Sequence, residues 1–528
     1  MVNLYPEFYN DVFGPLMQHG SSSHMAAPCR IGCLCASLLG EETAEILVEM
    51  DSEGSFSGTF GAMNEDLGMY NGAMGRMPDD PNFFSIKQEL RDRGIPFRCV
   101  FCEMKESEHI NSLKFILTGK SGKKATLVAN STGGGMVETV WVNGYAFRGM
   151  GDTYVLCVFD PESALCGETL GKAVSAAQTV LEQGCGEGQT GGRMHWFKLD
   201  GPLSPAAEAG LEGLEHALMQ PVLPVPTTAR KQPQLFDTMT EWRRLAAEQG
   251  KTLADVAIDY EIAASGWSRE QVVDYMENVL YPAFYRRTHA LYEEAVTPMS
   301  DPFSFPHYEY WAKAMPLLPV NMGVISKAIH YLMAANTPIP GVLNIPGPMG
   351  TGGGYLFSVL WAVKEDLDLP HDALIRGLFV SAGVGAICYT RTGPTGEVIG
   401  CTGECGVCTA MTAAGLTEML GGTPEQVEAA ASMALQASVG WPCDPIPGGK
   451  NMPCMSRVLF IAGMSIVYSQ WAMAGMDPVL PFHEVVDVAD KIGRDLPGEL
   501  LCTARGGHCA APTARALTCQ FKEWHKKQ

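Results

Sequence analysis

The chain has 528 residues, a length that allows about two to four domains. Hydrophobic residues make up 46% of it, which is ordinary for a globular protein and too high for a disordered one. The formal net charge of −21 argues against nucleic acid or an anionic membrane as the main partner. It leaves room for a small anionic substrate, because a local site can be positive inside an acidic protein.

The 17 cysteines indicate the compartment. The first 20 residues lack a basic region followed by an apolar one, so we expect no secretory signal peptide and a cytoplasmic protein. Reduced thiols or metal ligands are then expected rather than disulfides, and any single cysteine is more often a small buried apolar residue. The longest apolar stretch, residues 458–476, is interrupted by Ser469 and Gln470, and it predicts a fully buried helix rather than a membrane span.

Residues 1–150 are expected to form an α+β domain. Helical spacing runs through residues 36–50. Two β-hairpins follow: strands 113–118 and 125–131 flank the turn 119–124, and strands 138–142 and 145–147 flank Asn143-Gly144.

Residues 151–228 show a β-α-β-β-α-β order. Strand patterns at 153–159 and 194–199 alternate with helical patterns at 161–181 and 205–219, and a last short strand is expected at 221–225. This order resembles an ACT-type regulatory module; the alternative is that the segment completes the N-terminal domain. A linker is indicated by Pro221, Pro224, Pro226 and Pro233.

Residues 235–528 are expected to form one helical domain, so the fold class is α+β with an all-helical C-terminal part. Helices are predicted at 238–249, 268–278, 323–335, 354–366, 409–420 and 424–438. Ser268 is expected to cap the second of these.

Five cysteines lie in two unusual loops of this domain. Residues 395–410 hold Cys401, Cys405 and Cys408, and residues 439–457 hold Cys443 and Cys454. Three well-separated thiolates that meet at one point suit an iron–sulfur cluster with one iron left open. Zinc and inert core cysteines are competing readings that spacing leaves open. The C-x-x-C at 405–408 is a weak signal, because it equals one helical turn.

With these two loops the chain resembles the iron–sulfur L-serine dehydratases. In that family a Gly-Cys-x-Gly-Glu loop supplies one cluster ligand, and a Cys-Asp-Pro-x-x-Gly-(x5)-Cys loop supplies two more. The intervals here are 42 residues from Cys401 to Cys443 and 11 from Cys443 to Cys454, as in the family. The resemblance implies a [4Fe-4S] cluster held by Cys401, Cys443 and Cys454, and not by Cys405 or Cys408.

Other segments carry the same resemblance. Residues 20–28, GSSSHMAAP, are similar to the family's Gly-Pro-Ser-Ser-Ser-His signature, and residues 131–135 resemble its glycine triplet. The helix around Asn336 resembles the family's Asn-containing helix. The implied substrate-binding residues are Ser21, Ser22, Ser23, Gly133, Gly134 and Asn336, and His24 would orient the substrate or move a proton. A solvated turn with a structural histidine is the alternative for the serine motif.

Two departures from the family concern the substrate pocket. The family's Gly-His-Gly-Thr histidine, thought to be the base, falls on Met63, which cannot accept a proton. The candidate proton carriers are therefore His24, Glu65 and Asp66, and a carboxyl group needs a pKa raised by burial for this work. Arg391 replaces a family Asn and would suit a second anionic substrate group, unless it pairs with a local carboxylate.

The resemblance implies a β-elimination lyase that converts L-serine, or a related β-substituted amino or hydroxy acid, into pyruvate and ammonia with the open iron as Lewis acid. The alternatives are a more anionic substrate, an L-cysteine desulfidase-like activity, a non-catalytic amino-acid or cluster sensor, and a zinc hydrolase. We expect an oxygen-sensitive homodimer without nucleic-acid or membrane partners. Whether Cys509 or Cys519 contacts the cluster is left open.

Overall fold

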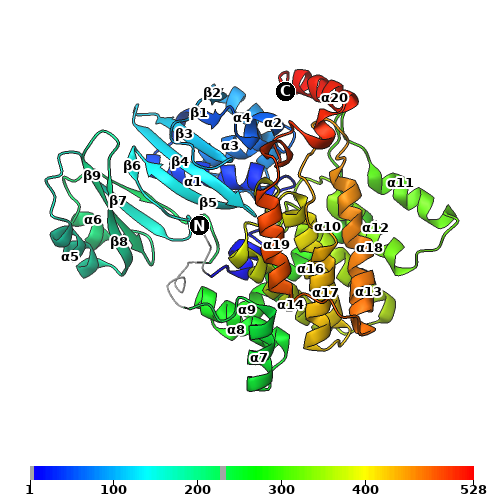
Figure 1. The fold of residues 1–528 in the computed structure, drawn as a ribbon. Coiled ribbons are helices and arrows are strands. Elements are labelled where there is room, and N and C mark those ends of the chain that lie inside the picture. Colours follow the sequence, from blue (N-terminus) through cyan, green and yellow to red (C-terminus); the bar gives the residue numbers. More distant parts are fainter. Residues whose placement is uncertain (1–4, 226–232) are drawn as a thin grey trace. The chain divides into compact units, whose positions relative to one another are not determined.

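The computed structural model describes residues 5–225 and 233–528 (Figure 1). The chain divides into two compact units. Ser23–Thr228 forms the α+β unit, and Met1–Ser22 together with Ala229–Gln528 forms the helical unit. The fold is therefore α+β, as predicted. Pro226, in the middle of the predicted linker, lies outside the described residues.

The first predicted helix, residues 36–50, is wrong. Helix α1 (Ala27–Leu39) ends at Gly40, whose φ of 71° is left-handed, and strand β1 (Thr43–Asp51) follows. The side chains of Ile46, Val48 and Met50 are buried while their neighbours are more exposed. This period of two is that of a strand with one buried face, whereas the prediction assumed the spacing of a helix.

The α+β unit is built first on a six-stranded sheet in the order β2-β1-β3-β4-β5-β6. Its further strands are β2 (Phe97–Cys102), β3 (Ser112–Gly119), β4 (Lys124–Gly133), β5 (Met136–Val142) and β6 (Tyr145–Ala146). The β1–β2 pair is parallel and the others are antiparallel. Both predicted hairpins are confirmed. Asn143 and Gly144 have φ values of 47° and 82°, which suit a type I′ turn.

Helix α1 lies directly on this sheet, and further helices pack around it. Helix α1 packs on β3 and β4, and α3 (Glu65–Ala73) packs on α1. The two helices are very close, since a Cβ on Gly68 or Gly72 would lie 2.2 or 2.0 Å from backbone oxygens of Met25 and Cys29. The short helices α2 (Ser55–Thr59), η3 (Phe83–Ser85) and α4 (Ile86–Asp92) complete this part. The glycines of α3 thus fix the helix that carries Glu65 against the start of α1.

A second, four-stranded sheet follows in the order β10-β7-β9-β8, with antiparallel neighbours. Its elements are β7 (Tyr154–Asp160), α5 (Gly167–Ala177), β8 (Val180–Glu187), β9 (Arg193–Leu199), α6 (Pro205–Ala209) and β10 (His216–Met219). The β-α-β-β-α-β order is that of ferredoxin-like folds. The predicted bounds differ: both helices are shorter, β8 and β10 begin inside the ranges predicted as helical, and residues 221–225 form no strand. An effector-binding role for this sheet stays a prediction.

The helical unit contains the helices predicted for it. Ser268 caps α9 and exchanges capping-box hydrogen bonds with Gln271. Bounds are α7 (Met239–Gln249), α8 (Leu253–Ser265), α9 (Arg269–Tyr275), η4 (Met276–Leu280), α10 (Tyr281–Glu293), α11 (His307–Ala314), η5 (Met315–Leu317), α12 (Val324–Asn336), α13 (Gly352–Leu367), α14 (His371–Arg391), α15 (Gly396–Ile399), η6 (Thr402–Gly406), α16 (Val407–Met419), α17 (Pro424–Gln436), α18 (Cys454–Met473), α19 (Phe482–Arg494), η7 (Gly498–Leu500), η8 (Gly507–Ala510) and α20 (Pro512–His525).

Helix α16 lies at the centre of this unit. It packs against α13, α14, α17 and α18, and every residue from Val407 to Thr417 is buried. Helix α14 is long and apolar enough to cross a membrane by length and composition, but 94% of its most apolar window is buried inside the protein. That burial is typical of a core helix.

Helix α18 corrects the prediction of a fully buried helix. One face is buried, through Val458, Ile461 and Ala462, whereas Val467 and Trp471 on the other side are 42% and 51% exposed. Hydrophobicity all around the helix suggested complete burial, but only one face meets α16 and α17.

The N-terminal segment, predicted to belong to the first domain, packs inside the helical unit. Its π-helical turn η1 (Phe8–Val12) contacts α14, and Phe8 stacks on Tyr260 of α8 with ring centroids 5.3 Å apart. The backbone N–H of Phe8 donates to the Glu261 carboxylate at 2.7 Å. The next turn, η2 (Ser22–Ala26), begins at the division between the two units.

Candidate functional site

The three cysteines singled out by their intervals all lie in the helical unit. Cys401 caps the N-terminus of η6, Cys443 lies in the loop between α17 and α18, and Cys454 is the first residue of α18. Cys401 and Cys443 are 3% and 5% exposed. The three side chains are therefore carried by two loops that enter or leave core helices.

These cysteines are close enough to act on one another electrostatically. Burial, and then the charge of Cys401, raises the pKa of the Cys454 thiol. The pKa of Cys443 is raised well above its ordinary range by a hydrogen bond to Cys502 and by burial, with further contributions from Glu404 and Cys401. Thiols held in this state bind a metal by giving up their protons.

Cys401 differs from the other two because its environment favours the thiolate. A hydrogen bond from Cys405 and the nearby Arg457 guanidinium lower the pKa of Cys401, although burial opposes them. Cys405 thus supports Cys401, one helical turn away. Cys408 turns elsewhere and donates to the backbone oxygen of Gly352 at 3.4 Å.

Glycines allow the two cysteine loops to approach. A Cβ on Gly396 would lie 2.6 Å from Cys443 Sγ. A Cβ on Gly400, whose φ is 67°, would lie 2.1 Å from the backbone oxygen of Trp441. Side chains at these positions would push the loops apart, so the sequence GEVIGC folds locally to bring Cys401 toward Cys443.

Buried carboxyl groups stand beside the cysteines. Glu404 Oε2 lies 4.0 Å from Cys443 Sγ, and burial, followed by the charges of Cys401 and Glu397, raises the pKa of Glu404 well above its ordinary range. The Asp444 carboxylate forms an ion pair with Arg457 at 2.8 Å. The surroundings of the thiols are thus polar and charged in an otherwise apolar core.

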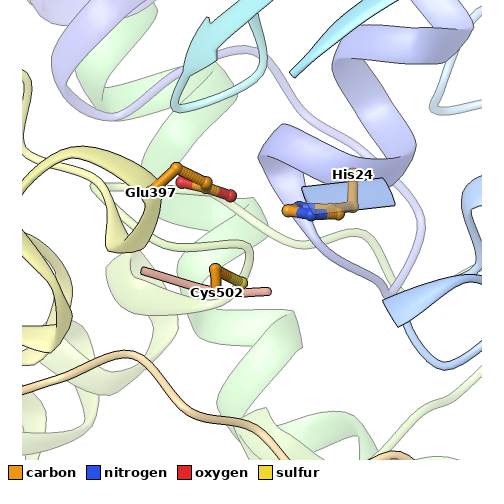
Figure 2. Close-up of side chains that lie close together, drawn as sticks. All are labelled: His24, Glu397 and Cys502. Atoms are coloured by element: carbon orange, nitrogen blue, oxygen red, sulfur yellow. The ribbon is translucent and has the colours of Figure 1, made fainter. Parts of the chain in front are cut away.

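Sequence reasoning missed two residues near these cysteines, Glu397 and Cys502. Figure 2 shows both side chains, and a carboxylate oxygen of Glu397 lies within 4.8 Å of the Cys502 thiol. Cys502 reaches the loop because its backbone N–H donates to the Cys443 oxygen at 2.7 Å. The figure also labels His24, which belongs to the α+β unit.

Asn336, at the C-terminal end of α12, is connected to the second cysteine loop. Its Oδ1 accepts hydrogen bonds from the Tyr355 hydroxyl at 2.7 Å and from Asn451 Nδ2 at 3.0 Å. Asn451 has a φ of 62° and lies three residues before Cys454. The predicted substrate-binding residue therefore also holds the loop that carries a cysteine.

The first two serines of the SSSH motif belong to the helical unit. Met17 pairs with Asn344, and a Cβ on Gly350 would lie 2.1 Å from the Gly20 oxygen and 3.1 Å from Ser21 Cα. The segment that ends in Ser21 and Ser22 is thus laid against the glycine-rich loop that precedes α13.

The last two residues of the motif, Ser23 and His24, belong to the α+β unit. Ser23 Oγ lies 2.9 Å from His24 Nδ1, and Ser55 Oγ lies 2.8 Å from His24 Nε2. The imidazole is completely buried, and both its nitrogens contact hydroxyl groups that fix its orientation.

The glycine triplet lies beside this histidine. Gly133, Gly134 and Gly135 all have positive φ values, of 104°, 61° and 91°, which explains why three glycines occur in succession. Ser131 donates to the Ser23 backbone oxygen at 2.7 Å, and Arg30 donates to the Gly135 oxygen. The α+β unit thus brings Ser23, His24 and the Gly133-Gly134 turn together.

The two candidate carboxylates behave differently. Burial raises the pKa of Glu65 to about 7, although the nearby His24 opposes the rise. Its Oε2 accepts N–H groups of Gly61 and Met63 at 2.7 and 3.1 Å. Asp66 instead forms an ion pair with Lys87 at 2.5 Å. Of the two, Glu65 therefore has a pKa suited to proton exchange near neutral pH, whereas Asp66 is held in an ion pair.

Arg391 pairs with nearby carboxylates, which is the alternative that the sequence left open. At the C-terminal end of α14 its guanidinium makes two bonds to Asp487, of 2.8 and 2.7 Å, and lies 3.5 Å from Asp237. A bidentate pair of this kind holds α14 to α19.

Comparisons with known proteins agree with the helical unit. Residues 343–508, which include all three cysteines, match the family described as "Serine dehydratase alpha chain". The probable L-serine dehydratase alpha chain of Bacillus subtilis is 28% identical over 287 residues, which cover 54% of this chain and 94% of that one.

A shorter alignment is closer in identity. The probable L-serine dehydratase alpha chain of Latilactobacillus sakei is 34% identical over 174 residues, 33% of this chain and 83% of that protein. L-serine dehydratase 1 of Escherichia coli is 27% identical over 52% of this chain and 62% of its own length. The chain therefore belongs to the L-serine dehydratase family.

Proposed function

We propose that this protein is a [4Fe-4S]-dependent β-elimination lyase that converts L-serine, or a close β-substituted analogue, into pyruvate and ammonia. Family membership makes it a serine dehydratase-like lyase. The observation that carries the finer proposal is that the buried Cys401 acts electrostatically on both Cys443 and Cys454, and that the three stand at the family's intervals.

The donor set fits an iron–sulfur cluster. Cysteine sulfurs are the ligands that such clusters use, and Cys401, Cys443 and Cys454 would hold the cluster while leaving one iron open to substrate. The space between the loops is kept by Gly396 and Gly400, where a Cβ would intrude. When bound, the cluster supplies a Lewis-acidic iron for the leaving hydroxyl of the substrate. Zinc also binds thiolates, so iron and acid-labile sulfide must be measured.

We assign carboxylate binding to hydroxyl and N–H donors. Ser21 and Ser22 offer hydroxyl groups, and the Gly133-Gly134 turn exposes backbone in conformations that only glycine adopts easily. Asn336 is proposed to contact the substrate as well, while its carbonyl oxygen keeps its bonds to Tyr355 and Asn451.

Proton transfer is assigned to His24 and Glu65. The family's histidine falls on Met63, whose backbone N–H bonds to the Glu65 carboxylate. A pKa of about 7 lets Glu65 take up and release a proton near neutral pH, and His24 is near enough to affect it. Asp66 is left with a structural role through Lys87.

Serine is favoured over a more anionic substrate. The argument for a second substrate anion rested on a free Arg391, and that guanidinium is paired with Asp487. No other feature of the described site residues argues for a second anion. A small, singly anionic amino acid is the substrate that suits the donors assigned above.

The experiment is anaerobic reconstitution with iron and sulfide, followed by iron and sulfide analysis and by assays of pyruvate and ammonia from serine. We expect a cluster, turnover of serine in preference to dicarboxylic β-hydroxy acids and cysteine, and loss of activity in air. Turnover without iron and sulfide would refute the cluster. Serine binding without any turnover of the panel would instead support a sensor. Light scattering on the same sample tests the expected homodimer.

A further inference from the structure

Arg457 stands out among the residues around the cysteines. It lies on α18, one turn after Cys454, and its side chain is only 13% exposed. Its Nη2 lies 2.8 Å from Oδ1 of Asp444, whose side chain is completely buried. A buried guanidinium with a single carboxylate partner has further donors to use.

The charge of Arg457 acts on the cysteines. The Arg457 guanidinium is near enough to lower the pKa of Cys401, and its charge also acts on Cys454 and on the neighbouring Glu404. Asp444 itself follows Cys443 in the chain. Arg457 is therefore one cation that shares a helix with the third cysteine, Cys454, is held by the residue next to the second, Cys443, and acts on the first, Cys401, through its charge.

The carboxylate that holds Arg457 is fixed from its other side. Asp444 Oδ2 accepts the backbone N–H of His508 at 2.7 Å and contacts His508 Nδ1 at 2.7 Å. Gly507 has a φ of 60°, and a Cβ there would lie 2.2 Å from Asp444 Oδ2. The lack of a side chain at Gly507 thus lets the backbone of this segment approach the Asp444 carboxylate.

We propose that Arg457, held by Asp444 and through it by the Gly507-His508 turn, is a positioning residue that balances the negative charge of the cluster cysteines. It thereby sets the reduction potential of the cluster and slows loss of iron. Net charge and hydrogen bonds to sulfur are the main means by which a protein tunes such a cluster. The planar guanidinium fork suits simultaneous bonds to a carboxylate and a sulfur. This inference rests on the proposed cluster.

The test compares Arg457→Gln, which keeps hydrogen-bond donors without the charge, with Arg457→Lys, which keeps the charge. Arg494→Met is the control, because Arg494 is 59% exposed and its change in net charge equals that of Arg457→Gln. All are reconstituted anaerobically. The potential of the cluster is measured by redox titration followed by electron paramagnetic resonance, and iron release by transfer to a chelator.

We expect Arg457→Gln to lower the potential and to release iron about tenfold faster, as expected for a lost hydrogen bond to a charged group. Arg457→Lys should keep a potential near that of the unchanged protein but release iron faster, because one ammonium cannot span Asp444 and Cys401. Arg494→Met should change neither. If Arg457→Gln does not fold, Arg457→Lys decides by its release rate.

An unchanged potential in a folded Arg457→Gln, or unchanged iron release in Arg457→Lys, would overturn the role of Arg457. Absence of iron and sulfide from the unchanged protein would instead refute the proposed function. The two failures are distinguished by analysing the unchanged protein first.

Discussion

Gly400, the residue before Cys401, offers the sharpest test of how the first cysteine is placed. It ends α15 with φ 67° and ψ −163°, a region that essentially only glycine occupies. A Cβ there would lie 2.1 Å from the Trp441 oxygen and 3.2 Å from Leu496 Cδ1. The substitution Gly400→Ala therefore combines backbone strain with an overlap against the loop of Cys443.

The magnitude follows from these two contributions. Strain at such a backbone position costs about 1–3 kcal/mol, and overpacking costs about 1–3 kcal/mol more. The free energy of unfolding should therefore fall by about 2–6 kcal/mol. Relief of the overlap must move Trp441 away from Gly400. Because Trp441 lies two residues before Cys443, that movement separates Cys443 from Cys401, and most of the bound iron should be lost.

The assay is urea unfolding of the cluster-free protein together with iron analysis after reconstitution. Gly421→Ala is the matched control, because Gly421 has a φ of 77° and no atom lies within 4 Å of its Cβ position. Gly421→Ala should lower the free energy of unfolding only by the strain of a left-handed residue, about 1–2 kcal/mol, and the variant should retain iron. Equal stability and equal iron in the two variants would refute the reasoning that Gly400 sets the spacing of the cysteines.

Three further predictions concern other site residues. Cys454→Ser should lose the cluster while Cys408→Ser keeps it, since Cys454 lies near Cys401 whereas Cys408 bonds to the Gly352 backbone; iron analysis of both variants checks this. Burial raises the pKa of Glu65 to about 7 in the folded protein, above its value in the unfolded chain. The protonated carboxyl group therefore contributes fully to stability below the unfolded-state pKa, and the free energy of unfolding falls by about 3 kcal/mol as the pH rises through 7. Glu65→Gln should remove this pH dependence when unfolding is measured at about pH 5 and about pH 8. Arg391→Gln should leave kcat/KM for serine unchanged and cost at most about 1 kcal/mol, because it breaks a partly exposed ion pair; a large rise in KM would show a substrate contact instead.

Local patterns in the sequence predicted the local structure well. The Asn143-Gly144 hairpin and the Ser268 cap depend on neighbouring residues only, and both are present. Residues 36–50 failed because Gly40 separates a helix from a strand inside one apolar stretch. Strand β8 was missed since only one of its eight residues is buried and it carries no apolar alternation.

The candidate site likewise contains residues that the sequence could single out and residues that it could not. Fixed intervals in the chain singled out Cys401, Cys443 and Cys454 as candidates, but no interval could point to Cys502 or Arg457, which reach the cysteine loops through contacts across the fold. Arg391 shows the converse, because a suggestive position gave no sign of its partner 96 residues later. Such pairings become visible only when distant elements are placed in space.

The packing of residues 5–22 inside the helical unit has a consequence for biosynthesis. Phe8 and Phe13 are synthesised before the α+β unit, yet their partners Tyr260 and Phe284 are made more than 200 residues later. During that interval the earliest aromatic side chains stay unburied while the α+β unit can already fold. Nascent chains should therefore be most prone to aggregate or to bind chaperones through residues 5–22, and that vulnerability ends only after α8 and α10 emerge.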